Sequence, residues 1–592
     1  MDSFLLSLLH FNIQYCAGGT EGLITVEGFP TDDASVQDQI VAESFEPVLA
    51  MLERHPGWHM DIELQAYMVE VLAGRHPEVL DRLRALAESG QVELVSFHYS
   101  DQLLLAFPWR DQQKSLELTA AVFDRYDLPL SDVVFAQEGQ FGEGMLERMP
   151  EFGYRTAILP KNLAGALWGA DPTAATWRYG EEVRVLIGGG SYETDRYRLD
   201  WDFLNDGELY ATGELNCYLG PAFVTDEAAL ARREAVLEEQ EAAGARLVTI
   251  GEFMAAHGDD AAEPLPDVVD GTWQPDDTDN FGLWMGGMGL FGVDNDDGVR
   301  VANVRARHML AAAELVEDAD TGLVEEGWKA ALLGEVSDAT GWNPIATEVA
   351  YGTDHAAGAQ AAAQASVAGA CLERGADWLL VDVATSRVTP NGTVEGGGGE
   401  AAAAPFSVEF SGRAGSAAFT TTAEPDVLDL AVTIEAGEAP FAVAFPWDGR
   451  VIATLPGLSE TLREVPADSI AADPIALPLA SGLLQLSEGV WLVKNTASSH
   501  LAGHFSRAEG TVSFEDATGG TDRRLQAWKV VLGDGERAVA VARSLNETPI
   551  VQLSCPPGPL TADLPCGCAT GPGAATWAAL AGVWLVRRRT RA

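Results

Sequence analysis

The first half of the chain alternates between two hydrophobic patterns. Residues 36–54 and 77–89 place apolar side chains at helical spacing, while residues 59–66 alternate apolar and polar side chains as a strand does. Further strands are predicted at residues 1–10, 92–97, 133–138, 154–160, 183–189, 208–215 and 247–253. Strands that alternate with helices are typical of βαβ units. Their number favours a closed parallel barrel of about seven or eight strands over an open sheet, although periodicity alone does not decide between the two.

The pattern changes from about residue 264 onward. Helical spacing returns at residues 301–316, 325–333 and 351–374, which predicts a helical domain packed beside the barrel. Residues 389–405 contain glycine, alanine and proline without an apolar period, which predicts a flexible linker. Beyond the linker, short apolar runs such as 427–434, 490–494 and 538–542 are separated by turn residues, which predicts an antiparallel β-sandwich.

The predicted fold class is therefore α/β, with a (β/α)7-type parallel barrel followed by a helical domain and a C-terminal antiparallel β-sandwich. We expect the barrel at residues 1–265, the helical domain at 266–388, the linker at 389–405, the β-sandwich domain at 406–553 and a C-terminal sorting or anchor tail at 554–592.

Composition narrows the class of partner. The 592 residues include 89 acidic and 37 basic side chains, a formal net charge of −52, which argues against nucleic acid or an anionic membrane surface as a partner and favours a neutral substrate. The six cysteines are too few and too scattered to predict a disulfide framework, and Cys566 and Cys568 lack the second pair that a zinc site needs.

The C-terminal segment 566–592 joins cysteines, a short apolar stretch and an arginine cluster, and it resembles the C-terminal sorting tag of myxobacterial surface proteins. Its apolar part, residues 574–586, is shorter than the ~20 residues of a stable membrane span. The resemblance implies attachment to the membrane or envelope, with the protein at the cell surface or secreted. Residues 1–10 show no secretion signal, so we expect the true start upstream.

Glu138 is the strongest candidate for chemistry. It follows the apolar run Val133–Phe135 and is followed at once by Gly139. This pattern is typical of a buried strand that ends with an acidic side chain at a cleft. Ligands gather outside the carboxyl ends of parallel strands, which places Glu138 at the mouth of the barrel. The plainer interpretation is a solvated glutamate in a strand-end turn.

Other polar side chains collect at predicted strand ends. His10, Asn12 and Gln14 lie on one face of the first strand if the strand extends that far. Glu63 belongs to the polar face of the second strand, His98 and Asp101 follow the third, and Gln140 follows the fourth. Several polar strand ends together favour a substrate site. His10 could also be a histidine of the core whose hydrogen bonds are made within the protein.

The order of these elements resembles glycoside hydrolase family 57 and its relatives, the family 38 mannosidases and some polysaccharide deacetylases, over about residues 4–350. The resemblance rests on His10, the turn Ser89–Leu94, the acid Glu138 and the stretch Trp284–Gly289. It implies a (β/α)7 barrel followed by helices, cleavage or transfer of α-linked sugars with retention, and Glu138 as the nucleophile.

The chain departs from the family pattern in two motifs. Family 57 usually shows His-Gln-Pro where this chain has His10-Phe-Asn12, and Trp-x-x-Glu where it has Phe135-Ala-Gln-Glu138. Metal-dependent relatives use a His-x-Asp pair, and Asn12 stands where that aspartate would be. A neutral amide is a poor metal ligand, so we expect no catalytic metal and no cofactor.

Glycoside hydrolysis needs a second carboxylate, which protonates the leaving oxygen. The resemblance places it on the seventh strand, where Glu214 is preferred over Asp206 and Glu208. We expect the carboxyl carbons of Glu138 and Glu214 to lie about 5–6 Å apart, as in a retaining site.

The predicted function is a retaining glycoside hydrolase or transglycosylase that acts on an α-linked glucan or related polysaccharide. Trp284, with Trp168 and Trp273, offers apolar faces for sugar rings, although tryptophan is as often plain core. The predicted substrate-binding residues are His10, Asn12, Gln14, Glu63, His98, Asp101, Gln140 and Trp284. Two alternatives stay open, namely a surface carbohydrate-binding protein without catalysis and a polysaccharide deacetylase.

Overall fold

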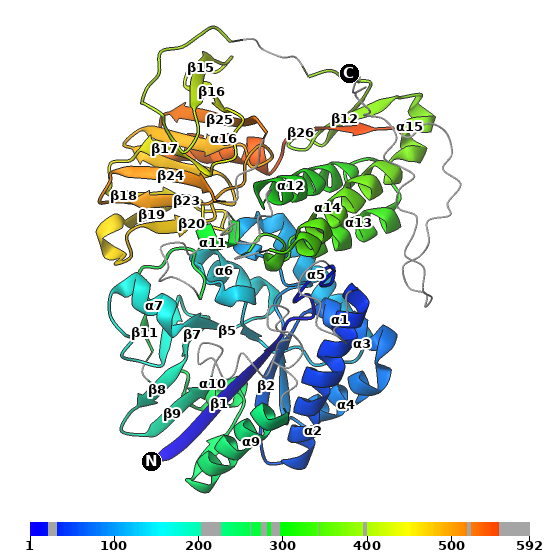
Figure 1. Cartoon of the computed structure of the whole chain (residues 1–592), viewed down its shortest axis with the longest axis vertical. Coiled ribbons are helices and arrows are strands. Elements are labelled where there is room, and N and C mark those ends of the chain that lie inside the picture. The colour runs from blue at the N-terminus through cyan, green and yellow to red at the C-terminus, as the bar shows by residue number, and fades with distance from the viewer. Residues whose placement is uncertain are drawn as a thin grey trace, which may run out of the picture. The chain divides into compact units, whose positions relative to one another are not determined.

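The computed structural model describes residues 1–21, 32–202, 227–260, 262–273, 281–285, 296–341, 344–394, 399–517 and 522–555, and every contact given below lies among them. Residues 1–556 form one compact unit (Figure 1). The predicted strand at 208–215 and almost all of the predicted tail lie outside the described residues.

The parallel-strand region, residues 1–264, is built around β1 (Asp2–Phe11). This strand is a nearly continuous apolar run because both of its faces are buried. It pairs in parallel with β2 (Met60–Leu64), β9 (Tyr197–Asp202) and β10 (Ala245–Leu247), and β2 pairs with β3 (Val92–Val95). The short β8 (Gly190–Glu193) pairs antiparallel with β9 and forms one edge of this sheet.

A second sheet continues the parallel arrangement. It contains β4 (Val133–Val134), β5 (Thr156–Pro160) and β7 (Val183–Gly188) in parallel, with β6 (Thr176–Tyr179) and β11 (Glu263–Pro264) at one edge. A parallel bridge pairs Leu94 of β3 with Leu130, which precedes β4 by three residues. The predicted mixed α/β architecture with parallel strands is confirmed, while closure into a barrel stays a prediction.

Helices flank these strands, and the predicted helices at 36–54 and 77–89 are confirmed (Figure 1). The first is α1 (Asp33–Ile40), a π-helical turn (Val41–Phe45) and α2 (Glu46–Arg54) in succession. The others are α3 (Ala66–Arg75), α4 (Pro77–Glu88), α5 (Trp109–Arg125), α6 (Glu143–Arg148), α7 (Lys161–Trp168), α9 (Glu227–Ala242) and α10 (Ile250–His257).

The predicted strand at 247–253 is largely wrong. The strand β10 ends at Leu247 and α10 begins at Ile250. Thr249 starts this helix, because its hydroxyl accepts the backbone N–H of Glu252 while the Glu252 carboxylate accepts the backbone N–H of Thr249. This reciprocal cap outweighs the β-rich composition of the run.

The helical layer comprises α11 (Phe281–Met285), α12 (Asp296–Ala313), α13 (Thr321–Gly334), α14 (Ala346–Ser366) and α15 (Ala368–Arg374). Its small side chains allow close packing, since a Cβ added to Gly327 of α13 would lie 2.5 Å from Leu310 of α12. The predicted helices at 301–316, 325–333 and 351–374 are confirmed, with the last divided into α14 and α15.

A three-stranded antiparallel sheet joins the C-terminal end of the described chain to the helical layer. Its strands are β12 (Trp378–Asp382), β13 (Arg387–Pro390) and β26 (Ile550–Ser554). Cys371 of α15 forms a disulfide with Cys555, although the scattered cysteines had predicted no disulfide framework. The predicted linker overlaps β13 at its start, and Ala401 within it bridges to Thr420.

The sandwich, residues 406–546, consists of two antiparallel sheets and one helix. One sheet holds β14 (Glu409–Ser411), β17 (Phe441–Pro446), β24 (Thr511–Asp516), β23 (Gly503–Ser506) and β20 (Ile475–Leu477). The other holds β15 (Gly415–Thr421), β16 (Val427–Ile434), β25 (Arg524–Leu532), β22 (Val490–Lys494), β21 (Leu483–Ser487), β18 (Val451–Thr454) and β19 (Arg463–Pro466). Their inner faces meet where Trp528 packs 5.2 Å from Phe445 and 4.9 Å from Phe514, measured between ring centroids.

Two of the three predicted strands quoted for the sandwich coincide with β16 and β22. The third, at 538–542, is wrong because it lies in α16 (Gly535–Asn546). Asp534 caps this helix, and Ala538, Val541 and Ala542 pack with Trp491. An apolar run of only five residues does not distinguish a strand from a buried segment of a helix.

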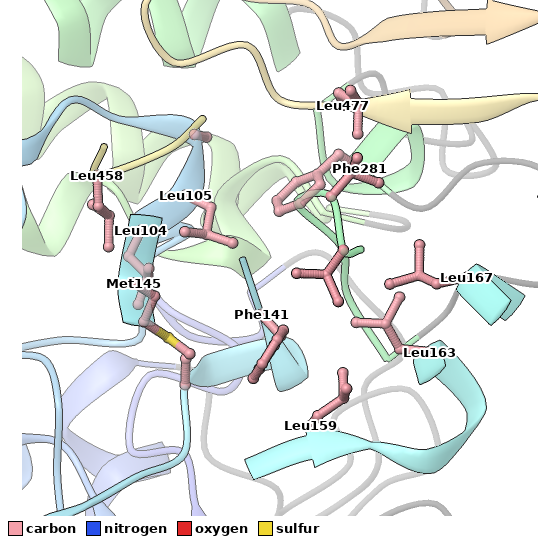
Figure 2. Close-up of a cluster of buried hydrophobic side chains, with 14 of the residues drawn as sticks. Leu104, Leu105, Phe141, Met145, Leu159, Leu163, Leu167, Phe281, Leu458 and Leu477 are labelled. Carbon is pink, nitrogen blue, oxygen red and sulfur yellow. The ribbon is translucent and has the colours of Figure 1, made fainter. Parts of the chain in front are cut away.

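The apolar core is shared by the three regions. Figure 2 shows Leu159 and Phe141 of the parallel-strand region gathered near Phe281 of α11 and Leu477 of the sandwich. These side chains belong to one buried cluster, which ties the sandwich to the strands that carry the candidate site. Within the described ranges, none of the helices is both long enough and apolar enough to cross a bilayer.

Candidate active site

The predicted strand at 133–138 is too long, because β4 ends at Val134 and Glu138 lies four residues further on in a short 3₁₀ turn, Gln137–Gly139. Its backbone has φ 58° and ψ 24°, in the left-handed region that costs a residue with a side chain roughly 1–3 kcal/mol. The carbonyl of Glu138 accepts the backbone N–H of Trp273 at 3.0 Å, which holds the turn in this conformation. The next residue must be glycine, because a Cβ on Gly139 would lie 2.8 Å from Pro160 and 3.0 Å from Trp273.

Among the described residues, three side chains donate hydrogen bonds to the carboxylate of Glu138, which is 8% exposed. Trp273 Nε1 donates to Oε2 at 2.7 Å. Ser337 Oγ and Gln137 Nε2 donate to Oε1 at 3.1 and 3.0 Å. Donors to a carboxylate stabilise its charged form, so this environment suits a nucleophile better than a proton donor.

His98 holds the turn through a hydrogen bond to its backbone. Its Nε2 accepts the backbone N–H of Gln137 at 3.2 Å, which requires that nitrogen to be unprotonated. Burial lowers the pKa of His98, and the nearby carboxylate of Glu63 offsets this only in part. His98 is therefore a neutral imidazole at neutral pH, and it fixes the residue that precedes Glu138.

Glu63 lies close to both His98 and His10. Its Oε2 forms a short hydrogen bond with His10 Nδ1, and its Oε1 lies 3.7 Å from His98 Nε2. All three side chains are almost fully buried. The His10 ring also lies 5.8 Å from the ring of Phe135, at an angle of 71°. The structure thus brings these three predicted residues together, and His98 links them to Gln137, which precedes Glu138.

Asn12 and Gln14 occupy a turn after β1, because the strand ends at Phe11 and not beyond Gln14 as the prediction required. The side-chain Oδ1 of Asn12 accepts the backbone N–H of Gln14, and the side-chain Oε1 of Gln14 accepts the backbone N–H of Asp101 at 3.0 Å. Asn12 Nδ2 donates to Asp338 at 3.1 Å. These residues connect β1 to the loop that carries Ser337.

Gln140 braces the turn internally. Its Nε2 donates to the carbonyls of Gln137 and Gln102, and its Oε1 accepts the backbone N–H of Leu105. Among the tryptophans, Trp284 of α11 is buried at 4% exposure, and its carbonyl accepts the hydroxyl of Thr340. The indole N–H of Trp168 donates to Asp267, away from Glu138.

Ser337 and Asp338 were not among the predicted site residues. They follow α13 in a loop that Arg300 of α12 holds by donating to the carbonyls of Glu335, Val336 and Ser337 at 2.9, 3.0 and 3.3 Å. The backbone N–H of Ser337 donates to the carbonyl of Asp101. No local pattern marks this loop, since its relation to Glu138 arises only when the helical layer packs on the strands.

Glu214, Asp206 and Glu208 lie outside the described residues, so the second acid and its distance from Glu138 stay predictions. Among the residues whose placement is described, no group of three or more histidine, cysteine, aspartate or glutamate side chains is arranged to hold a metal ion. The side chains of His10 and Glu63 form a hydrogen bond with each other.

Comparison with solved structures identifies the fold. An alpha-mannosidase from Enterococcus faecalis V583 aligns with a TM-score of 0.58 and 9% sequence identity, over 94% of this chain and 90% of that chain. At this identity the likeness shows a shared fold and nothing about activity. A GH57-type branching enzyme from Pyrococcus horikoshii aligns at a TM-score of 0.44 with 14% identity, a likeness too weak to build on.

Short stretches of the chain are similar in sequence to alpha-amylases. A 77-residue stretch is 31% identical to an alpha-amylase from Pyrococcus horikoshii, and an 84-residue stretch is 26% identical to alpha-amylase 1 from Dictyoglomus thermophilum. These stretches cover 13% and 14% of this chain, and the chain spans only 12% of the length of either curated relative. No protein-family model matches the chain.

Proposed function

We propose that this chain is a retaining glycoside hydrolase or transglycosylase that acts on an α-linked glucan, with Glu138 as its nucleophile. The observation that carries the proposal is a nearly buried carboxylate at the carboxyl end of a parallel strand, held by three hydrogen-bond donors in a strained turn. The local similarity to alpha-amylases supports the glucan as the substrate. The two sheets of mainly parallel strands favour a (β/α)7 barrel as the scaffold.

The geometry suggests how the reaction would proceed. A carboxylate oxygen of Glu138 attacks the anomeric carbon, and the bond from that carbon to the leaving oxygen breaks as a second acid supplies a proton. Water then attacks the glycosyl-enzyme ester, with the second acid acting as base, and Glu138 leaves as a carboxylate. Glu214 remains our proposal for the second acid. An acceptor sugar in place of water would give transfer with the same retained stereochemistry.

Replacing Glu138 tests the proposal. Glu138→Gln should abolish turnover of maltoheptaose, because a neutral amide is too weak a nucleophile, while binding should stay within about tenfold. Glu143→Gln is the matched control, since Glu143 is a half-buried glutamate of α6 whose carboxylate accepts the hydroxyl of Tyr179 at 3.0 Å. A 2-fluoro sugar with an activated leaving group should label Glu138 covalently in the unmutated protein.

Other outcomes would assign a different function. Activity on an acetylated polysaccharide that a chelator removes would favour the deacetylase. Binding of a polysaccharide without hydrolysis of any aryl glycoside between about pH 4 and 9 would favour a surface carbohydrate-binding protein. Attachment of the chain to the cell envelope through residues 566–592 is a separate proposal, and it rests on the sequence alone.

A further inference from the structure

A cavity of about 340 Å³ lies where the three regions meet. Its walls come from the first turn of α5, from α12 and from the 455–460 loop and the end of α16 in the sandwich. This volume falls within the range of about 300–1,000 Å³ that small-molecule sites occupy, and such sites favour domain interfaces. None of the side chains that donate to Glu138 lines it, so the cavity is separate from the candidate active site.

Three groups at this cavity have hydrogen-bonding capacity that the described residues do not use. Arg307 is 1% exposed, and its Nε and Nη1 donate to Asp111 and to the carbonyl of Asn546, which leaves Nη2 without an acceptor there. No described residue donates to the carboxylate of Glu547 or accepts from the indole N–H of Trp109. A buried guanidinium and a carboxylate beside one cavity, both with unused capacity, indicate a polar ligand.

The charges around the cavity select a neutral ligand. Arg307 and Arg110 oppose a cation, whereas Glu314, Glu460 and Glu547 oppose an anion. Glu314 is already satisfied by Arg110, Lys114 and the indole N–H of Trp328. Burial raises the pKa of Glu547, which reduces the negative charge at the cavity as the pH falls.

The remaining groups match the chemistry of sugar hydroxyls. A hydroxyl both donates and accepts, so it can donate to Glu547 and accept from Arg307 or from the indole of Trp109. Trp109 is held in place by the guanidinium of Arg148, 4.7 Å from the indole centroid, and by the ring of Phe152 at 5.7 Å. A braced indole beside a polar pair offers an apolar surface for the C–H face of a pyranose ring.

We infer that this cavity is a second carbohydrate-binding site, which takes a neutral sugar of about one or two rings and is separate from the site at Glu138. The inference does not require the proposed function, because the cavity would bind sugar whether or not Glu138 turns it over. A free disaccharide and the end of a polysaccharide chain present the same hydroxyls, so both are candidate ligands.

The test uses the full chain carrying Glu138→Gln, so that no probe is consumed. Maltose, cellobiose and maltotetraose are titrated by calorimetry into this protein and into the same protein with Ala311→Phe, which places a phenyl ring into the cavity from α12. Ala361→Phe is the matched control, because Ala361 is exposed on α14. Ala311→Phe should weaken binding of at least one probe at the cavity by tenfold or more, while Ala361→Phe should leave every affinity unchanged.

Trp109→Phe gives a second, milder measurement in case Ala311→Phe does not fold. It keeps an aromatic ring against Arg148 but removes the indole N–H, and it should weaken the same binding event about three- to tenfold. Unchanged affinities for all probes in both variants, or binding of glycine or glutamine at the cavity in place of sugar, would overturn the inference. Failure of the proposed function is seen separately, as absent turnover by the unmutated chain while the effect of Ala311→Phe persists.

Discussion

At the scale of single residues, the turn at Glu138 combines backbone strain with a fully engaged carboxylate. The left-handed conformation is held by a backbone hydrogen bond from Trp273, and the indole of the same residue donates to the carboxylate. Strain of this kind persists only where the surroundings fix it, and it concentrates at functional sites. The turn therefore holds the carboxylate oxygens of Glu138 in one place, as the proposed reaction requires.

The hydroxyl of Ser337 gives the first prediction at this scale. Ser337→Ala removes one donor to Glu138 Oε1, and a hydrogen bond to a charged group contributes about 1.5–3 kcal/mol. We expect kcat on maltoheptaose to fall about 10- to 100-fold with little change in KM. Ser191→Ala is the control, because Ser191 donates to Asp200 at 2.6 Å on β8, away from Glu138. Equal kinetics for both variants would show that Ser337 has no role in the reaction.

The sequence identified Glu138 but few of its partners. An apolar run, an acid and a glycine are adjacent in the chain, so their pattern can be read locally. Trp273 and Ser337 stand 135 and 199 positions away from Glu138, and nothing in their neighbourhoods marks them as its donors. The prediction that His98 and Glu63 contact substrate stays a prediction, and in the structure His98 also accepts the backbone N–H of Gln137, the residue before Glu138.

At the scale of elements, local apolar runs predicted most helices and strands but failed where a cap decided the outcome. Residues 247–253 and 538–542 both have strand-like composition. Thr249 and Asp534 start helices there by accepting backbone N–H groups of the first turn. The buried face of α16 then rests on Trp491, a contact that only the assembled sandwich provides.

Arg300 supplies the prediction for the helical layer, because it holds the loop that carries Ser337. Arg300→Lys keeps the charge but loses the planar fork that reaches the carbonyls of residues 335, 336 and 337. We expect kcat to fall about tenfold and unfolding to require less urea. Arg305→Lys is the control on the same helix, since Arg305 is exposed and contacts the carbonyl of Ala497. Lower stability with an unchanged kcat for the folded protein would limit Arg300 to a structural role.

At the scale of the whole molecule, Asp270 follows the parallel-strand region, to which the adjacent Gly271 is bridged at Phe141, and it contacts the sandwich. Its Oδ2 accepts the backbone N–H of Gly457 at 2.8 Å, and burial raises its pKa to about 7. In the unfolded chain the carboxyl ionises near pH 3.8, so between pH 4 and 7 the folded protein keeps a proton that the unfolded chain has lost. Stability contributed by Asp270 is therefore present at low pH and is lost as the pH rises towards 7.

Asp270→Asn tests this linkage, because the amide stays neutral at every pH. One pKa unit corresponds to about 1.4 kcal/mol, so the loss in the unmutated protein is on the order of 4 kcal/mol between pH 4 and 8. We expect the free energy of unfolding of the variant, relative to the unmutated protein, to improve from pH 5 to pH 8. Urea denaturation at both pH values measures the difference. A difference that does not change with pH would contradict the assignment.

The sequence could not predict that the end of the described chain returns to the helical layer. Pairing of β26 with β12 joins segments more than 160 residues apart, and hydrophobic patterns predict strands without naming their partners. Cysteine spacing was equally uninformative, because Cys371 and Cys555 stand 184 positions apart and meet only through this pairing. Long-range contacts of this kind follow from the packing of the whole chain.

The disulfide gives the last prediction. It closes a long loop that includes the sandwich, and a bridge of this kind stabilises a protein by about 2–4 kcal/mol, in one account by restricting the unfolded chain. Cys371→Ser, Cys555→Ser and the double variant should lower the free energy of unfolding by similar amounts, because each removes the same bond. Urea denaturation of the three variants, with peptide mapping of the bond in the unmutated protein, provides the measurement. Additive losses in the double variant would show that the two cysteines contribute independently, and that the bridge is not what holds the end of β26 to α15.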